Sequence, residues 1–249
     1  MIISHKKKFV YLRSTKTGSS SFEIYLSQYC STKDIISPLF KDEEKLKKKY
    51  NLPLGQNYIL KKKSFGIKNF LNLNFYNDVH VHDHVSIDKI FKTTIGFKIR
   101  DYFFFSFIRN PFDWIVSYFW WDLYFHKKKK ISWINKIDQK KLIGIFKIFL
   151  EEECSNFFNW QKNIVTSKNV NIKLFKYENY DENIKKIGKV LDLNRDKEIL
   201  SVKNIRFKKL KIDRKIFIDQ SDKKKIIESA KFFFKNYYNN KTLPSKYKN

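Results

Sequence analysis

The chain has 249 residues, of which 42% are hydrophobic and 18% aromatic, and this composition excludes a disordered chain. Its formal net charge of +27 at pH 7 favours anionic partners, although Lys-rich stretches are usually solvated surface. Only six of the 52 basic residues are Arg, so each Arg is the better candidate for a planar, bidentate contact with an anion.

Neither a disulfide-rich nor a membrane-spanning protein is expected. Cys30 and Cys154 are the only cysteines, and no C-x-x-C pair is available for a metal. The first residues lack an apolar signal core, and the longest apolar runs, near Phe103–Ile108 and Ile143–Leu150, are far shorter than a membrane span. We therefore expect a cytoplasmic protein with no transmembrane segment and no metal.

The predicted elements alternate along the chain between short strands and amphipathic helices. The predicted strands are Lys8–Arg13, Asp78–His82, Tyr102–Ile108 and Asn171–Tyr177. The predicted helices are Ser19–Gln28, Asp42–Tyr50, Ser86–Lys92, Asn110–Phe125, Asp138–Glu153, Asp181–Leu191 and Ser221–Tyr238. Residues 31–75 read as an irregular excursion. The alternation implies an α/β fold with a mostly parallel central sheet, and no linker divides residues 1–249, so we predict a single domain.

A Ser/Thr-rich loop, Ser14–Ser21 (STKTGSSS), joins the first predicted strand to the first predicted helix. The backbone N–H groups and the dipole at such a helix start favour a phosphate-type anion, and Lys16 can add a point charge. The loop is not a Walker A motif, because Lys16 precedes Gly18 instead of following a glycine. A Ser-capped helix after a turn is the alternative that binds no ligand.

A second motif, Phe107–Ser117 (FIRNPFDWIVS), follows the predicted buried strand. Arg109 lies at the carboxyl end of that strand, where parallel α/β sheets bind ligands. Its guanidinium is well placed there to form a bidentate contact with a phosphate. Ser117 lies two helical turns further along. The structural alternative is an Arg at the sheet edge and a Ser that bonds back to a helix carbonyl.

Together, the two motifs resemble the carbohydrate sulfotransferases, the family of heparan sulfate 2-O-sulfotransferase and many bacterial relatives. The resemblance extends weakly to Phe175–Glu182 and to Asn204–Arg206, and the family often has Arg where this chain has Trp114. It implies transfer of a sulfo group from 3'-phosphoadenosine-5'-phosphosulfate (PAPS) to a hydroxyl, here of a glycan or glycolipid, with PAP as product. The nucleotide-binding residues that it implies are Lys16, Thr17, Gly18, Ser19, Ser20, Ser21, Arg109, Ser117 and, more weakly, Arg206.

Three histidines, His80, His82 and His84, alternate before the predicted helix that starts near Ser86. Alternate residues share one face of a strand, but a fourth metal ligand is missing from the segment. The segment resembles the His-x-His-Val stretch that supplies the base in the 2-O-sulfotransferase branch. The resemblance implies His84 as the catalytic base, with His82 as second choice and Lys16 beside the leaving group. An imidazole base would titrate near neutral pH.

The resemblance also implies a three-layer, P-loop-like domain similar to nucleotide kinases, with fixed donors in place of a metal. The sequence leaves two alternatives to a sulfotransferase. A P-loop-like kinase would use ATP, but the Walker A and Walker B patterns are missing. A nucleic-acid-binding protein would explain the charge, but no recognised binding motif occurs, so no specific nucleic acid is expected. Neither the acceptor nor the oligomeric state follows from the sequence.

Overall fold

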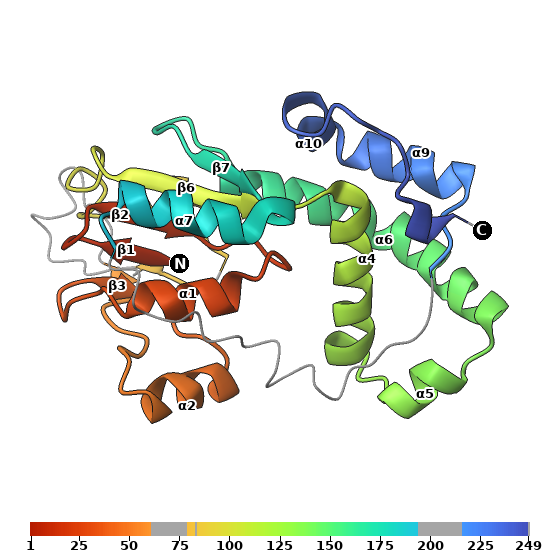
Figure 1. Cartoon of the computed structure of the whole chain (residues 1–249), viewed down its shortest axis with the longest axis horizontal. Coiled ribbons are helices and arrows are strands. Elements are labelled where there is room, and N and C mark those ends of the chain that lie inside the picture. The colour runs from red at the N-terminus through yellow and green to blue at the C-terminus, as the bar shows by residue number, and fades with distance from the viewer. Residues whose placement is uncertain (61–78, 83, 194–215, 249) are drawn as a thin grey trace, which may run out of the picture. The chain divides into compact units, whose positions relative to one another are not determined.

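The computed structural model describes residues 1–60, 79–82, 84–193 and 216–248 (Figure 1). Its residues form two compact units, each built from several stretches of chain. The sheet unit comprises Met1–Ser14, Gly18–Ile108 and Asn163–Val202, and the helical unit comprises Thr15–Thr17, Arg109–Lys162 and Lys203–Asn249. The single domain over residues 1–249 stays a prediction.

The sheet unit contains a five-stranded sheet with the order β3-β1-β2-β6-β7 within the described residues. Its strands are β1 Ile2–Ser4, β2 Phe9–Leu12, β3 Ile35–Ile36, β6 Phe103–Ile108 and β7 Lys173–Lys176. The three strands β2, β6 and β7 are parallel, whereas β1 runs antiparallel to both β2 and β3. The predicted α/β fold with a mostly parallel central sheet is therefore confirmed.

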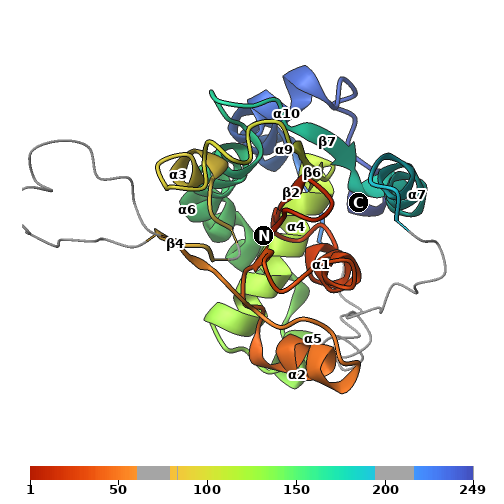
Figure 2. The ribbon, with the colours of Figure 1, turned by 90° about the vertical axis from the view of Figure 1, so that its left-hand side faces the viewer.

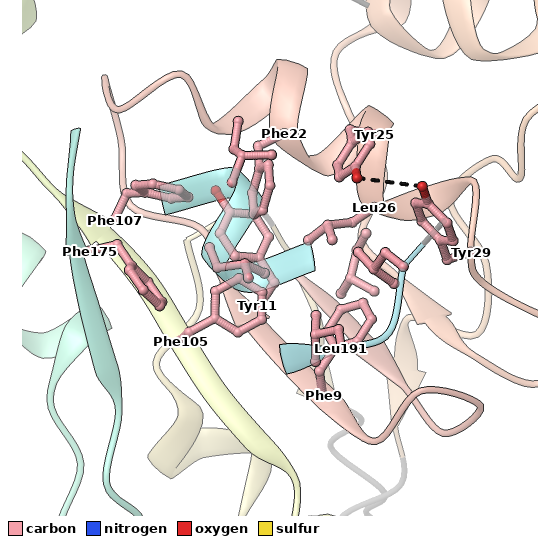
Figure 3. Packing of buried hydrophobic residues seen from close by; sticks show 14 of the residues in the cluster. Phe9, Tyr11, Phe22, Tyr25, Leu26, Tyr29, Phe105, Phe107, Phe175 and Leu191 are labelled. Carbon is pink, nitrogen blue, oxygen red and sulfur yellow. Dashed lines mark hydrogen bonds between the residues drawn. The ribbon is translucent and has the colours of Figure 1, made fainter. Parts of the chain in front are cut away.

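One face of this sheet carries an aromatic core (Figure 3). Helices α1 (Ser19–Ser27) and α7 (Tyr180–Val190) pack on that face. The Phe22 ring lies 5.1 Å from the Tyr11 ring and 5.2 Å from the Phe107 ring, both edge-on. Burial of each such ring stabilises the fold by about 1.5–3 kcal/mol, so the core fixes α1 firmly on the ends of β2 and β6.

The opposite face of the sheet carries the side chains that alternate with this core along each strand. Phe104 alternates with its neighbours and contacts Phe91, which ends the short helix α3 (Ile87–Ile90), with ring centroids 6.1 Å apart. Figure 2 accordingly shows α3 on the other side of the sheet from α1 and α7. Helix α3 begins at Ser86, whose hydroxyl accepts a hydrogen bond from the Asp88 backbone, as predicted.

Residues 31–60, predicted to lie in an irregular excursion, contain regular secondary structure. They hold β3, the charged helix α2 (Lys41–Lys49) and β4 (Ile59–Leu60). Strand β4 pairs with β5 (Val79–His80) in a separate two-stranded sheet, so the predicted strand at Asp78–His82 does not join the main sheet. Such short pairings depend on tertiary contacts that leave no periodic pattern in the sequence.

The helical unit is built around Trp114, which is fully buried. Helix α4 (Pro111–Trp121) begins at Asn110, whose side chain caps the Phe112 N–H. It continues into the π-helical turn η2 (Asp122–His126), and the indole of Trp114 packs edge-on against Phe157 and Phe233. The other elements are α5 Ile131–Lys136, α6 Gln139–Val165 up to Lys162, α9 Gln220–Ser229, α10 Lys231–Asn236 and the 3-10 turn η4 Ser245–Tyr247.

Two of the predicted helices differ clearly from the observed ones. Helix α6 runs well past Glu153, because its apolar face continues through the buried Phe157 and Phe158. The single helix predicted over Ser221–Tyr238 is instead two helices, α9 and α10, which meet at the buried Ala230.

Candidate functional site

The Ser/Thr-rich loop connects β2 to α1, and its residues fall into both units. Gly18 has a left-handed backbone with φ of 70°, and a Cβ atom there would lie 3.0 Å from the Tyr177 ring and 3.3 Å from the Tyr180 ring. The Tyr180 hydroxyl donates a hydrogen bond to the Gly18 carbonyl at 3.2 Å. Both the positive φ and the close aromatic rings therefore require glycine at this position.

The start of helix α1 is not capped by a serine. Gly18 occupies the N-cap position, so the alternative of a Ser-capped helix is wrong. The first N–H groups of any helix lack intrahelical partners and carry partial positive charge. The Ser20 hydroxyl accepts a hydrogen bond from Arg13 Nη2 at 2.7 Å, and the Ser19 hydroxyl accepts one from Arg13 Nε at 3.4 Å. With their oxygens engaged in this way, both hydroxyls can turn their hydrogens to an anion.

Arg13 contacts the candidate site, although the sequence motifs do not indicate it. Only 3% of its surface is exposed, and its Nε lies 3.6 Å from Oε2 of the fully buried Glu23. The guanidinium thus joins a carboxylate inside α1 to the two serines at the helix start. A buried pair of this kind fixes geometry more than it adds stability. The scarcity of Arg in the chain is the one signal that could have indicated it.

His84 lies directly beside the loop, within the sheet unit. Its Nδ1 is 2.7 Å from the Arg13 carbonyl, and a carbonyl only accepts, so Nδ1 donates and Nε2 of the neutral ring keeps its lone pair. Burial, followed by the positive charge of Arg13, lowers the pKa of His84 to about 3. The titration near neutral pH expected from the sequence is therefore wrong for this ring, which stays neutral at pH 7.

The other histidines of this segment differ from His84. His80 and His82 are both exposed, and the His82 N–H bonds to the His80 carbonyl at 3.1 Å. In the part of the chain that the structure describes, no group of three or more His, Cys, Asp or Glu residues could hold a metal ion. His84 contacts the Arg13 carbonyl, which directly precedes the loop.

The helical unit holds the middle of the loop by its backbone. The Trp114 indole donates to the Thr15 carbonyl at 2.6 Å, and the Gln161 side-chain oxygen accepts from the Thr15 N–H at 3.0 Å. Arg109 Nη1 donates to the Lys16 carbonyl at 3.1 Å. Trp114, where the resembling family often has Arg, is therefore a loop-positioning residue. Lys16 has φ of 59°, so the loop bends sharply at the residue whose ammonium we expect to meet the anion.

Arg109 and Ser117 line one cavity of about 440 Å³ in the helical unit. Asp113, Ser117 and Trp120 all line it, because residues four and seven positions apart share one face of α4. Tyr247, from the turn η4, closes another side of the cavity. Within the helical unit, the structure thus brings Arg109 together with Ser117 and with the Lys16 carbonyl.

The remaining predicted binding residues differ in what the structure says of them. Thr17 is buried, and Ser21 is partly buried in the first turn of α1. Arg206 lies outside the described residues. No helix within the described ranges is long and apolar enough to cross a membrane.

Comparison with known proteins gives one match. The family model described as the sulfotransferase family matches residues 1–230, which include both the Ser14–Ser21 loop and the Arg109–Ser117 segment. Neither the curated proteins nor the solved structures contain a match. Because the match spans most of the chain and both parts of the candidate site, the protein belongs to the sulfotransferase family.

Proposed function

We propose that the protein is a cytoplasmic O-sulfotransferase that uses PAPS as donor, releases PAP and sulfates a hydroxyl of a glycan or glycolipid. The observation that carries the proposal is the cavity of the helical unit, which Arg109 and Ser117 line. The start of α1 in the sheet unit is a second element suited to an anion. Within the helical unit, Arg109 also donates a hydrogen bond to the Lys16 carbonyl. A nucleotide with phosphates at both its 5' and 3' positions suits two such subsites.

Each part of the site has a distinct role in this proposal. PAPS supplies the sulfo group and a stable bisphosphate leaving group. Thr17–Ser21 bind the 5'-phosphate side with N–H and hydroxyl groups, and Lys16 places positive charge beside the bridging oxygen as that bond breaks. Arg109 and Ser117 bind the 3'-phosphate, and Arg206 is proposed to contact the nucleotide.

The acceptor side of the reaction depends on His84. Its Nδ1–H donates a hydrogen bond to the Arg13 carbonyl, so Nε2 is the nitrogen able to take a proton. In the proposed step the acceptor oxygen forms its bond to sulfur, the bond from sulfur to the bridging oxygen breaks, and the acceptor proton passes to Nε2. A ring that holds protons weakly can still take one from an oxygen that becomes strongly acidic as it bonds to sulfur.

An assay with radioactive PAPS and a mixture of hydroxyl-bearing glycans and glycolipids tests this proposal. The expected result is label in an acceptor, with one PAP released for each sulfo group transferred. A matched reaction with Arg109→Ala measures the background of PAPS hydrolysis. Absence of both PAPS binding and PAP release in the wild-type protein would contradict the proposal.

Replacing Arg109 with Lys is expected to weaken PAP binding. A lysine keeps the charge but cannot reproduce a planar fork that bonds phosphate and the Lys16 carbonyl together. The expected loss is on the order of 1–3 kcal/mol, the scale of a hydrogen bond to a charged group. Calorimetry with PAP measures it, and Arg100→Lys is the control, because Arg100 is exposed and stacks on Phe97. Equal PAP affinity of Arg109→Lys and wild type would contradict the proposed contact between Arg109 and the nucleotide.

A further inference from the structure

Two residues near the end of the described chain complete the cavity that holds Arg109 and Ser117. Lys246 and Tyr247 line it, yet both lie beyond residues 1–230, which the sulfotransferase family model matches. The family match therefore says nothing about their role, for which their contacts are the evidence.

Asp113 holds both residues at the cavity. The Tyr247 hydroxyl donates to Asp113 Oδ1 at 2.6 Å, and Lys246 Nζ lies 2.6 Å from the same oxygen. The backbone of the turn is fixed as well, because the Ile218 N–H bonds to the Tyr247 carbonyl at 3.0 Å. Burial and the bond to Asp113 raise the pKa of the Tyr247 hydroxyl, which therefore remains a donor at pH 7.

The charges at this cavity explain why Lys246 matters. Arg109 and Lys246 are cations and Asp113 is an anion, so these three side chains leave one net positive charge. Asp113 alone would repel a phosphate that approaches Arg109, since only 16% of its side chain is exposed and water screens it weakly. Lys246 offsets that repulsion, and its side chain is 58% exposed on a flexible stem that can reach an incoming anion.

We propose that Lys246, held by Asp113 and Tyr247, is a specificity-determining residue for the nucleotide 3'-phosphate. The inference rests on the proposed function, because it assigns the cavity of Arg109 and Ser117 to that phosphate. Lys246 both neutralises Asp113 and supplies a point charge to the phosphate, while Tyr247 fixes the carboxylate that positions it. Discrimination between nucleotides with and without a 3'-phosphate then depends on Lys246.

Calorimetry of Lys246→Ala with PAP and with AMP tests the inference. PAP affinity should fall roughly tenfold or more, the scale of a charged contact, because one cation is lost and Asp113 is left uncompensated. AMP affinity should be unchanged, since AMP lacks the 3'-phosphate. Lys248→Ala is the matched control, because Lys248 is an exposed lysine two positions further along. Thermal melting checks that each variant is folded.

A second variant separates repulsion by Asp113 from loss of the lysine contact. Asp113→Asn combined with Lys246→Ala removes both charges, so PAP affinity should recover part of the loss seen with Lys246→Ala alone. An unchanged PAP affinity in Lys246→Ala, an equal loss for PAP and AMP, or no recovery in the double variant would each overturn the inference. Wild-type protein that binds PAP no better than AMP would overturn the proposed function instead.

Discussion

Replacing His84 with Ala should lower turnover roughly 100- to 10,000-fold and leave PAP affinity unchanged, because a positioned base acts on the acceptor and not on the nucleotide. His84→Asn is the sharper variant, since its amide can still donate to the Arg13 carbonyl but has no nitrogen able to take a proton. Single-turnover measurements with saturating PAPS give the rate. His82→Ala, at an exposed neighbour, is the control and should cost much less.

The pH dependence of this base follows from its environment. With His84 as the base, the rate rises with pH as the ring loses its proton. This rise is centred on the pKa of His84 in the folded enzyme. Burial and the Arg13 charge lower the pKa of His84 to about 3, so the wild-type rate should be level through the range around pH 6.5. A rise in the wild-type rate centred near pH 6.5, absent in His84→Asn, would contradict the lowered pKa of His84. Full activity of both His84 variants would mean that the base is another group.

Replacing Lys16 with Ala should lower turnover by about 100- to 1,000-fold, the scale of one lost electrostatic stabiliser. The effect on PAP affinity should be smaller, because charge builds on the bridging oxygen only as the bond breaks. Comparison of the rate at saturating PAPS with PAP affinity from calorimetry separates the two effects.

Lys8→Ala is a matched control for this variant. Lys8 is also a lysine with positive φ, 52° compared with 59° at Lys16, so both substitutions place alanine in the same backbone region. Lys8 precedes β2 and is exposed. A Lys16→Ala enzyme with normal turnover and weaker PAP binding would reduce Lys16 to a binding residue.

The elements that the sequence predicts well are those with strong local signals. The apolar run that becomes β6, and the Asn110-Pro111 start of α4, identify a buried strand and a capped helix without any tertiary information. Strand β1 gave no such signal, because three residues are too few to show a period.

The sequence indicates the parts of the candidate site that lie in contiguous motifs, and not those that depend on contacts between distant segments. The Ser14–Ser21 loop and the pair of Arg109 and Ser117 are predicted from motif spacing. Arg13 could not, because its partners are set by the packing of α1 on the sheet. Asp113 and Lys246 lie far apart in the sequence, and a charged pair of ordinary residue types leaves no pattern to search for.

The measurement that tests the central claim most directly is calorimetry of the wild-type protein with PAP, AMP and ATP side by side. Two anion subsites predict that PAP binds tightest, at least roughly tenfold tighter than AMP, since AMP cannot contact Arg109 and Ser117 with a 3'-phosphate. ATP should also bind more weakly than PAP, because its extra phosphates extend from the 5' side only. Equal affinity for PAP and AMP, or tighter binding of ATP, would contradict the assignment of PAPS as the donor.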